Sequence, residues 1–201
     1  MRKQIELIIG LSLFIVSCQQ HSSLKPREYI EYMENAENYM RQSVTAGKDV
    51  FVIQLSTPEY VACKEFQADR NINDSLFIKR IKELKNVIFF QINISKIKDN
   101  QTVMEHKQED ALSESRVMYY SSIAANDIEL SIDGNMNKPS AYHYEDNYGL
   151  TPYNTILVGF NVPDNYSSMT LSFNDRFTNN PMIKASYSKK AIQNLPSLKI
   201  K

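Results

Sequence analysis

The chain has 201 residues, and its 23 basic and 23 acidic side chains give a formal net charge of zero at pH 7. This balance argues against nucleic acid as a partner, because proteins that bind nucleic acid carry a clustered excess of basic residues. The length is sufficient for one domain with a substantial core or for two small subdomains.

The first 17 residues have the layout of a secretory signal peptide. Arg2 and Lys3 form a short basic segment, and an apolar run follows over residues 7–16. The run is shorter than the ~20 apolar residues of a membrane-spanning helix, so we expect it to be cleaved rather than kept as an anchor. It leads into Ile15-Val16-Ser17-Cys18, which resembles the lipobox of bacterial lipoproteins.

The lipobox resemblance implies that residues 1–17 are a cleaved signal peptide and that the Cys18 thiol is acylated. One acyl chain holds a protein to a membrane only marginally, whereas the two or three chains of a lipoprotein anchor it stably. The alternative is an ordinary signal peptide with a chance cysteine at its end. Residues 18–25 are then a lipidated polar tether. By the same resemblance, the lack of aspartate after Cys18 favours the outer membrane, and the lack of an acidic cluster favours a domain that faces the periplasm.

The mature chain contains one further cysteine, Cys63, so no disulfide can form within it. Removing residues 1–17 leaves 184 residues with 21 basic and 22 acidic side chains. Cys63 lies between Tyr60 and Phe66 at helical spacing, which is typical of a small buried hydrophobic residue. A nucleophilic thiol would need a basic partner to lower its pKa, and the sequence names none.

Residues 26–126 are predicted to form an α/β part that begins with a helix. Pro26 suits a first helical turn, and apolar residues at spacings of three and four continue to Met40, as one amphipathic helix or two short ones. Strands are predicted at residues 50–55 and 87–94, and the continuous apolar run of the second is typical of a central, buried strand.

Further helices are predicted in this part of the chain, and two of them begin at recognisable start signals. Thr57 suits an N-cap and Pro58 the first helical residue of a second helix. A third helix after Asn73 or Asp74 has an apolar face and a basic cluster, which is more simply a solvated face than a ligand site. Residues 96–109 are expected to be a mobile loop, and residues 112–125 a helix.

Residues 127–201 change to short alternating runs, which predict antiparallel strands. The runs lie at residues 128–132, 141–143, 156–160, 169–173, 183–187 and 198–200. Turn signals such as Asp133-Gly134 separate them. This pattern suggests a small β-sandwich or curled sheet. The boundary near Asn126 is a change of pattern rather than a linker, so we expect the two parts to share one core.

Three stretches, at residues 25–30, 57–65 and 143–153, resemble a set of uncharacterised lipoproteins of the Bacteroidota. The resemblance spans most of the mature chain. It implies that the protein belongs to the bacterial cell envelope, and it implies nothing about activity.

Asp133-Gly134-Asn135-Met136-Asn137 resembles the first five places of an EF-hand calcium loop. The loop requires glycine at its sixth place, where this chain has Lys138, and a bidentate glutamate at its twelfth, where it has Tyr144. A hairpin turn explains the stretch better, so no metal site is predicted.

His143 and Glu145 would project from one face of a predicted strand, with Tyr142 and Tyr144 on the other. An imidazole beside a carboxylate could move a proton or bind a divalent metal, although two groups are too few for a specific zinc site. The alternative is a structural strand with a hydrogen-bonded histidine and packed tyrosines.

Tyr148 and Tyr153 flank a turn imposed by Gly149 and Pro152, and we take them as the first candidates for a recognition site. Loops on a β scaffold concentrate binding residues, and tyrosine offers a large contact area. Twelve tyrosines invite a glycan-binding interpretation, which the lack of tryptophan weakens. The chain has no nucleophile elbow, zinc-protease helix, phosphate loop or dinucleotide fingerprint.

We therefore predict an α+β fold, with N-terminal helices and a two-strand element followed by an antiparallel β part. The predicted function is a membrane-anchored envelope lipoprotein with a non-enzymatic binding or assembly role, without a cofactor. The partner would be an envelope protein or a glycan. The alternative is a periplasmic or surface hydrolase, or a glycan-active protein, that uses His143 and Glu145.

Overall fold

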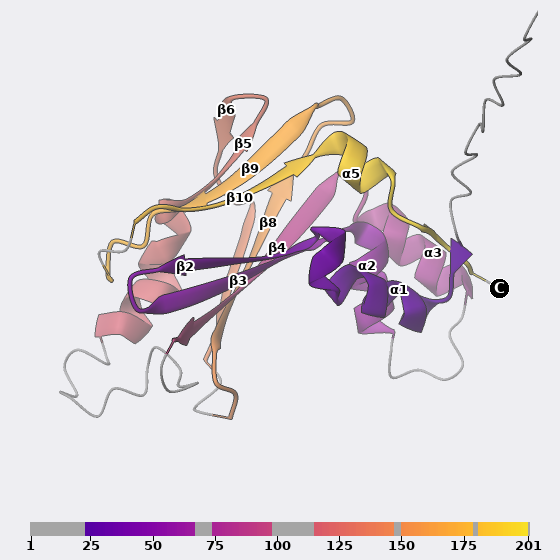
Figure 1. Ribbon diagram of the computed structural model, residues 1–201. Coiled ribbons are helices and arrows are strands. Elements are labelled where there is room, and N and C mark those ends of the chain that lie inside the picture. The colour runs from indigo at the N-terminus through magenta and orange to yellow at the C-terminus, as the bar shows by residue number, and fades with distance from the viewer. Residues whose placement is uncertain (1–22, 67–73, 98–114, 147–149, 179–180, 201) are drawn as a thin grey trace, which may run out of the picture.

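The computed structural model describes residues 23–66, 74–97, 115–146, 150–178 and 181–200 (Figure 1). The predicted signal peptide, Cys18 and most of the tether lie outside these ranges, as do Tyr148 and most of the predicted 96–109 loop. The described part has an α+β fold, as predicted, in which two antiparallel sheets pack together beside a group of helices. No helix within the described ranges is both long and apolar enough to cross a membrane.

The larger sheet has five strands drawn from both parts of the chain. Its spatial order is β2-β3-β4-β8-β7, and every neighbouring pair is antiparallel. The strands are β2 (Arg41–Ala46), β3 (Asp49–Ser56), β4 (Val87–Lys96), β8 (Asn154–Asn161) and β7 (Ala141–Glu145). The predicted strands at 50–55 and 87–94 are β3 and β4, and β4 is the central strand of this sheet.

The smaller sheet has the order β10-β9-β5-β6. Its strands are β5 (Ile128–Ile132), β6 (Asn135–Asn137), β9 (Ser168–Phe173) and β10 (Ile183–Ser188). Asp133 and Gly134 both have positive φ, 48° and 88°, in the tight turn between β5 and β6. This geometry is that of a two-residue hairpin turn, so the predicted hairpin is confirmed.

The core lies between the two sheets. Alternate residues of each strand point inward, and aromatic rings join the sheets where Phe51 meets Phe173 at 6.1 Å and Phe90 meets Tyr187 at 5.7 Å between ring centroids. All four side chains are at most 3% exposed. Burying a side chain of this size stabilises the fold by about 1.5–3 kcal/mol, so this layer is a main source of stability.

Three helices gather at one end of the sheets (Figure 1): α1 (Pro26–Glu34), α2 (Pro58–Glu65) and α3 (Asp74–Glu83). A short 3₁₀ turn, η1 (Ala36–Asn38), follows α1. The start of α2 is as predicted, because the Thr57 hydroxyl accepts a hydrogen bond from the Tyr60 amide at 3.3 Å and Pro58 is the first helical residue. α1 is joined to the large sheet where Gln54 Nε2 donates to the Met33 carbonyl at 3.0 Å.

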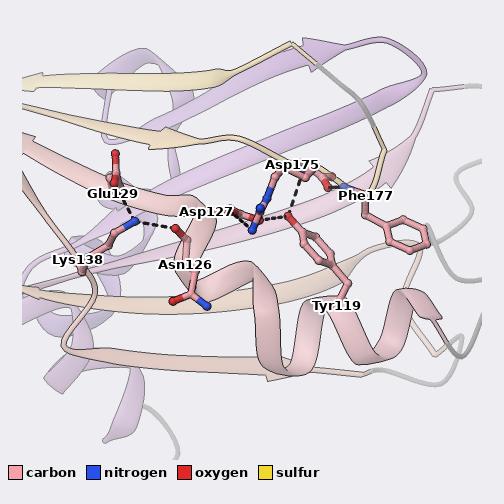
Figure 2. Close-up of polar contacts among 8 residues, drawn as sticks. Tyr119, Asn126, Asp127, Glu129, Lys138, Asp175 and Phe177 are labelled. Atoms are coloured by element: carbon pink, nitrogen blue, oxygen red, sulfur yellow. Dashed lines mark hydrogen bonds and ion pairs between the residues drawn. The ribbon is translucent and has the colours of Figure 1, made fainter.

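A helical segment over residues 115–127 lies at the other end of the sheets (Figure 1). It contains a π-helical turn, η2 (Tyr119–Ile123), and a 3₁₀ turn, η3 (Ala124–Asp127). The Tyr119 hydroxyl donates to Asp127 at 2.9 Å and accepts from the Arg176 amide at 3.2 Å (Figure 2). Arg176 also pairs with the Asp127 carboxylate at 2.7 Å, which fastens this segment to the chain that follows β9.

The first and last described strands pair with each other. β1 (Ser23–Leu24) and β11 (Ser197–Leu198) form a two-residue parallel ladder, and the Lys199 amide donates to the Leu24 carbonyl at 2.8 Å. A short helix, α5 (Lys189–Gln193), connects β10 to β11. The run at 198–200 was predicted to be antiparallel, and that detail is wrong, because its partner is the other end of the chain.

The N-terminal part contributes three strands rather than the predicted two. Of the two alternatives predicted up to Met40, the structure has the divided one, with α1 ending at Glu34 and η1 at Asn38, and β2 begins at Arg41. β2 is an edge strand with mostly polar residues that remain partly exposed, so it has no apolar alternation to mark it. The predicted helix at 112–125 is helical over its described residues, 115–125, and contains η2, while residues 112–114 lie outside the described ranges.

Candidate functional site

The outward face of the large sheet carries a row of five aligned side chains. The strand register places them directly opposite one another in the order Arg41, Gln54, Gln91, Leu157 and His143. Side chains alternate between faces along a strand, so this row points away from the core. The next row is Ser43, Val52, Asn93, Thr155 and Glu145. The first row crosses the whole sheet.

Two adjoining hollows open over these rows, and we call them together the outer groove. The polar hollow, of about 250 Å³, is lined by Glu34, Arg41, Val52, Gln54, Tyr60, Lys64, Gln91, Asn93 and Tyr153. The apolar hollow, of about 400 Å³, includes Val61, Phe89, Ala141, His143, Leu157 and Gly159. The hollows share Tyr60, Lys64 and Gln91, so they lie side by side between α2 and the sheet.

Glu34 is held as a carboxylate at the helical wall of the polar hollow. Lys64 Nζ lies 3.0 Å from Glu34 Oε1, and the Tyr60 hydroxyl donates to the same oxygen at 2.8 Å. Burial acts to raise the pKa of Glu34, but these two hydrogen bonds, together with the charges of Lys64 and Arg41, outweigh it and hold the pKa below its usual value. Burial, and then the bond to Glu34, raise the pKa of Tyr60, so its hydroxyl stays a neutral donor.

A second ion pair, between Arg80 and Glu65, forms part of the lining of the apolar hollow. Arg80 donates twice to Glu65, from Nε and Nη2, with both distances 2.7 Å. The hydrogen bonds to Glu65 raise the pKa of Arg80. In contrast, the Arg41 guanidinium makes no hydrogen bond or ion pair within the part of the chain that the structure describes. Arg41 is therefore a cation of the groove that makes no ion pair among the described residues and acts on Glu34 through its charge alone.

Side-chain amides form the floor of the polar hollow. Asn93 Oδ1 accepts from Gln91 Nε2 at 3.0 Å and from the Thr155 hydroxyl at 3.1 Å. Gln54 is 6% exposed, and its Nε2 donates to the Met33 and Leu55 carbonyls. Its Oε1 has no hydrogen-bond partner among the described residues, so the floor contains a buried acceptor that lacks a donor.

Phe89 and Gly159 shape the floor of the apolar hollow. The two residues are opposite each other in the register, and a Cβ placed on Gly159 would come within 2.8 Å of Phe89 Cε1. The glycine therefore lets the Phe89 ring lie directly over the strand. Leu157 and Val61 line the same hollow.

The structure brings two of the predicted binding residues to the outer groove from separate segments. His143 lines the apolar hollow and Tyr153 the polar hollow. Glu145 lies in the next row, opposite Thr155, and Tyr148 lies outside the described residues. His143 and Glu145 are exposed and form no hydrogen bond with one another.

Tyr142 and Tyr144 of β7 are packing residues, as expected if β7 is a structural strand. Tyr142 donates its hydroxyl to the Tyr120 carbonyl, and Tyr144 stacks on the Tyr120 ring at 5.9 Å. They are half-buried, on the face opposite His143 and Glu145. β7 thus packs with its tyrosines and presents its histidine outward.

The other sequence candidates have local structural roles. The Asp133 carboxylate accepts hydrogen bonds from the Ser167 and Ser168 amides at 2.9 Å, and these bonds hold its pKa below the usual value. Within the described ranges, no three or more His, Cys, Asp or Glu side chains are placed to hold a metal ion. Cys63 is 1% exposed, and burial, followed by the charge of Glu59, raises its pKa to about 12. Such a thiol is a poor nucleophile.

Comparison with known proteins adds no assignment. No protein-family model, curated protein or solved structure matches the chain.

Four residues of the groove were not predicted from the sequence as site residues: Arg41, Lys64, Gln91 and Asn93. Gln91 and Asn93 alternate with buried Phe90 and Ile92 in β4, and this polar alternation within an apolar strand indicated an exposed face. Lys64 and Arg41 carry no such signal, because they reach the groove only through the packing of α2 and the pairing of β2.

Proposed function

We propose that the protein is a membrane-anchored envelope lipoprotein whose domain binds a ligand or partner in the outer groove. The lipobox at residues 15–18 supports the anchor. The observation that carries the binding role is the pair of adjoining hollows, whose lining comes from five strands and three helices and includes both His143 and Tyr153. Small-molecule sites are typically concave and combine apolar walls with a few placed polar groups.

With lipid on Cys18, the short tether would hold the domain near the membrane. Five residue steps separate Cys18 from Ser23, where β1 begins. A fully extended chain spans about 3.3–3.6 Å per residue, so the lipidated residue lies within about 18 Å of β1. The helical end, where β1 meets α1, is then the part of the domain nearest to the bilayer.

The groove itself argues for binding rather than hydrolysis. Its carboxylates Glu34 and Glu65 are each engaged by a cation, so neither is free to act as a base. A catalytic histidine is usually oriented by a hydrogen bond to a carboxylate. His143 makes no such hydrogen bond among the described residues.

The anchor is tested by metabolic labelling with an alkyne analogue of palmitate. We expect the wild-type chain to take up label and sediment with membranes, and Cys18→Ser to lose both, because a hydroxyl cannot replace the acylated thiol. Cys63→Ser is the matched control and should label as the wild type does. Label that persists in Cys18→Ser would contradict the proposed anchor.

The binding role is tested by placing a photo-crosslinking amino acid at Leu157, inside the groove, and at Met136, which is 54% exposed on β6 of the other sheet. In intact cells, crosslinks specific to the Leu157 position are expected. Equal or no crosslinking at the two positions would contradict a binding role for the groove.

A further inference from the structure

The two hollows of the outer groove differ in chemical character. The polar hollow is lined mainly by charged, amide and tyrosine side chains, whereas the mostly apolar lining of the other hollow includes Val61, Phe89 and Leu157 beside the paired Arg80 and Glu65. They adjoin at Tyr60, Lys64 and Gln91, which line both hollows. A ligand that fills both must have a polar end and an apolar body.

The charges indicate the sign of the polar end. Lys64 is paired with Glu34, and Arg80 is paired with Glu65. After these pairs are matched, the described lining keeps one positive charge in excess, and the Arg41 guanidinium, which acts on Glu34 through its charge alone, makes no ion pair among the described residues. Guanidinium groups favour planar, doubly accepting anions such as carboxylates, so the charge complement of this end is an anion.

The cross-strand register sets the distance between the two ends. Arg41 and Leu157 belong to one row, with Gln54 and Gln91 between them. Neighbouring strands lie about 4.8 Å apart, so three spacings separate the two Cα positions by about 14 Å. The row therefore joins the cationic end to the apolar floor along a straight path.

From this arrangement we propose that the outer groove binds a single-chain anionic amphiphile, with a carboxylate head at Arg41 and an acyl chain over Phe89, Gly159 and Leu157. The inference rests on the proposed binding role of the groove and specifies its ligand. The acyl chain covers the apolar floor, and the head compensates the charge of Arg41. The short tether keeps the groove close to a bilayer, which is a source of such molecules.

The test uses the mature lipidated protein in phospholipid nanodiscs and dodecanoate with a diazirine at its terminal carbon. Photolysis should attach the probe to peptides that contain Val61, Phe89 or Leu157. Excess dodecanoate should remove most of the label, whereas dodecanol, which lacks the anionic head, should be at least tenfold less effective.

Two variants separate the contributions of head and chain. Arg41→Gln should reduce labelling about tenfold, while the control Arg27→Gln, an exposed residue paired with Glu31 on α1, should not change it. Gly159→Leu should also reduce labelling, because its side chain would occupy the apolar hollow. A thermal melt of each variant shows whether the fold is retained.

Three outcomes would overturn the inference. These are equal competition by dodecanol, unchanged labelling in Arg41→Gln, and displacement of the probe by cell-wall glycan fragments but not by dodecanoate. The last outcome would leave the groove as a binding site with another ligand, so the proposed function would stand. Failure of the wild-type protein to insert into nanodiscs would instead count against the lipid anchor.

Discussion

Asp175 is the buried carboxylate that joins the chain after β9 to the helical segment 115–127. Its side chain is fully buried and accepts hydrogen bonds from the Tyr120 hydroxyl at 2.8 Å, the Thr178 hydroxyl at 2.8 Å and the Phe177 amide at 3.1 Å. Tyr120 is itself 1% exposed, so water cannot readily replace its acceptor. Removing Asp175 should therefore be costly.

The magnitude follows from the donors that Asp175→Ala would leave. A buried donor without an acceptor costs about 1–3 kcal/mol, and hydrogen bonds to a charged group contribute about 1.5–3 kcal/mol each. The donors of Thr178 and Phe177 are only partly buried and can be rehydrated. We therefore expect Asp175→Ala to lower the free energy of unfolding by about 3 kcal/mol, mainly through the orphaned Tyr120 hydroxyl.

A double-mutant cycle isolates that hydrogen bond. Tyr120→Phe removes the donor, so Asp175→Ala should cost about 1.5 kcal/mol less in the Tyr120→Phe background than in the wild type. The assay is urea denaturation followed by circular dichroism, with Asp164→Ala, an exposed position, as the control. A coupling energy below about 0.5 kcal/mol would refute the reasoning, because the two residues would then act independently.

Three further predictions concern Cys63, the buried tyrosines and Tyr153. Cys63→Ala should lower the free energy of unfolding by about 1 kcal/mol and leave binding intact, and a thiol reagent should modify Cys63 only as the protein unfolds. Fast modification of the native protein would show instead that Cys63 is accessible. Burial raises the pKa of Tyr29, Tyr120 and Tyr187. These tyrosines stay neutral in the folded state while an unfolded tyrosine ionises near pH 10, so stability should be retained below about pH 10 and fall above it, by up to about 1.4 kcal/mol per pH unit for each. A flat urea midpoint between pH 9.5 and 11.5 would contradict this. Tyr153→Ala should weaken ligand binding by more than about 1 kcal/mol with little change in melting temperature. A large fall in melting temperature with unchanged binding would assign Tyr153 to packing.

The elements that the sequence predicted well are those whose pattern is set by burial. β4 and β8 are apolar on the core face, and the start of α2 carries its own cap in Thr57 and Pro58. β2 was missed because an edge strand with polar residues needs no alternation; its place is set by pairing with β3. Local pattern therefore predicts the centre of a sheet better than its edge.

The outer groove could be predicted only in fragments. His143 and Tyr153 were selected for their chemistry, and the alternation in β7 correctly placed His143 and Glu145 on one face. The alignment of Arg41 with Leu157 in one row depends on a register that spans four strands. The hydrogen bond between Tyr120 and Asp175 joins residues 55 positions apart. Contacts of this range arise from tertiary packing and leave no local sequence signal.

The pairing of β1 with β11 has a practical consequence for anyone who labels this protein. Because Leu24 and Leu198 are neighbours, a fusion partner added after residue 201 would start beside the segment that leads to Cys18. If Cys18 is acylated, that partner would be crowded against the lipid headgroups. A fluorophore or epitope inserted at the turn between β5 and β6, which Figure 1 shows away from the helical end, would instead stand clear of the bilayer.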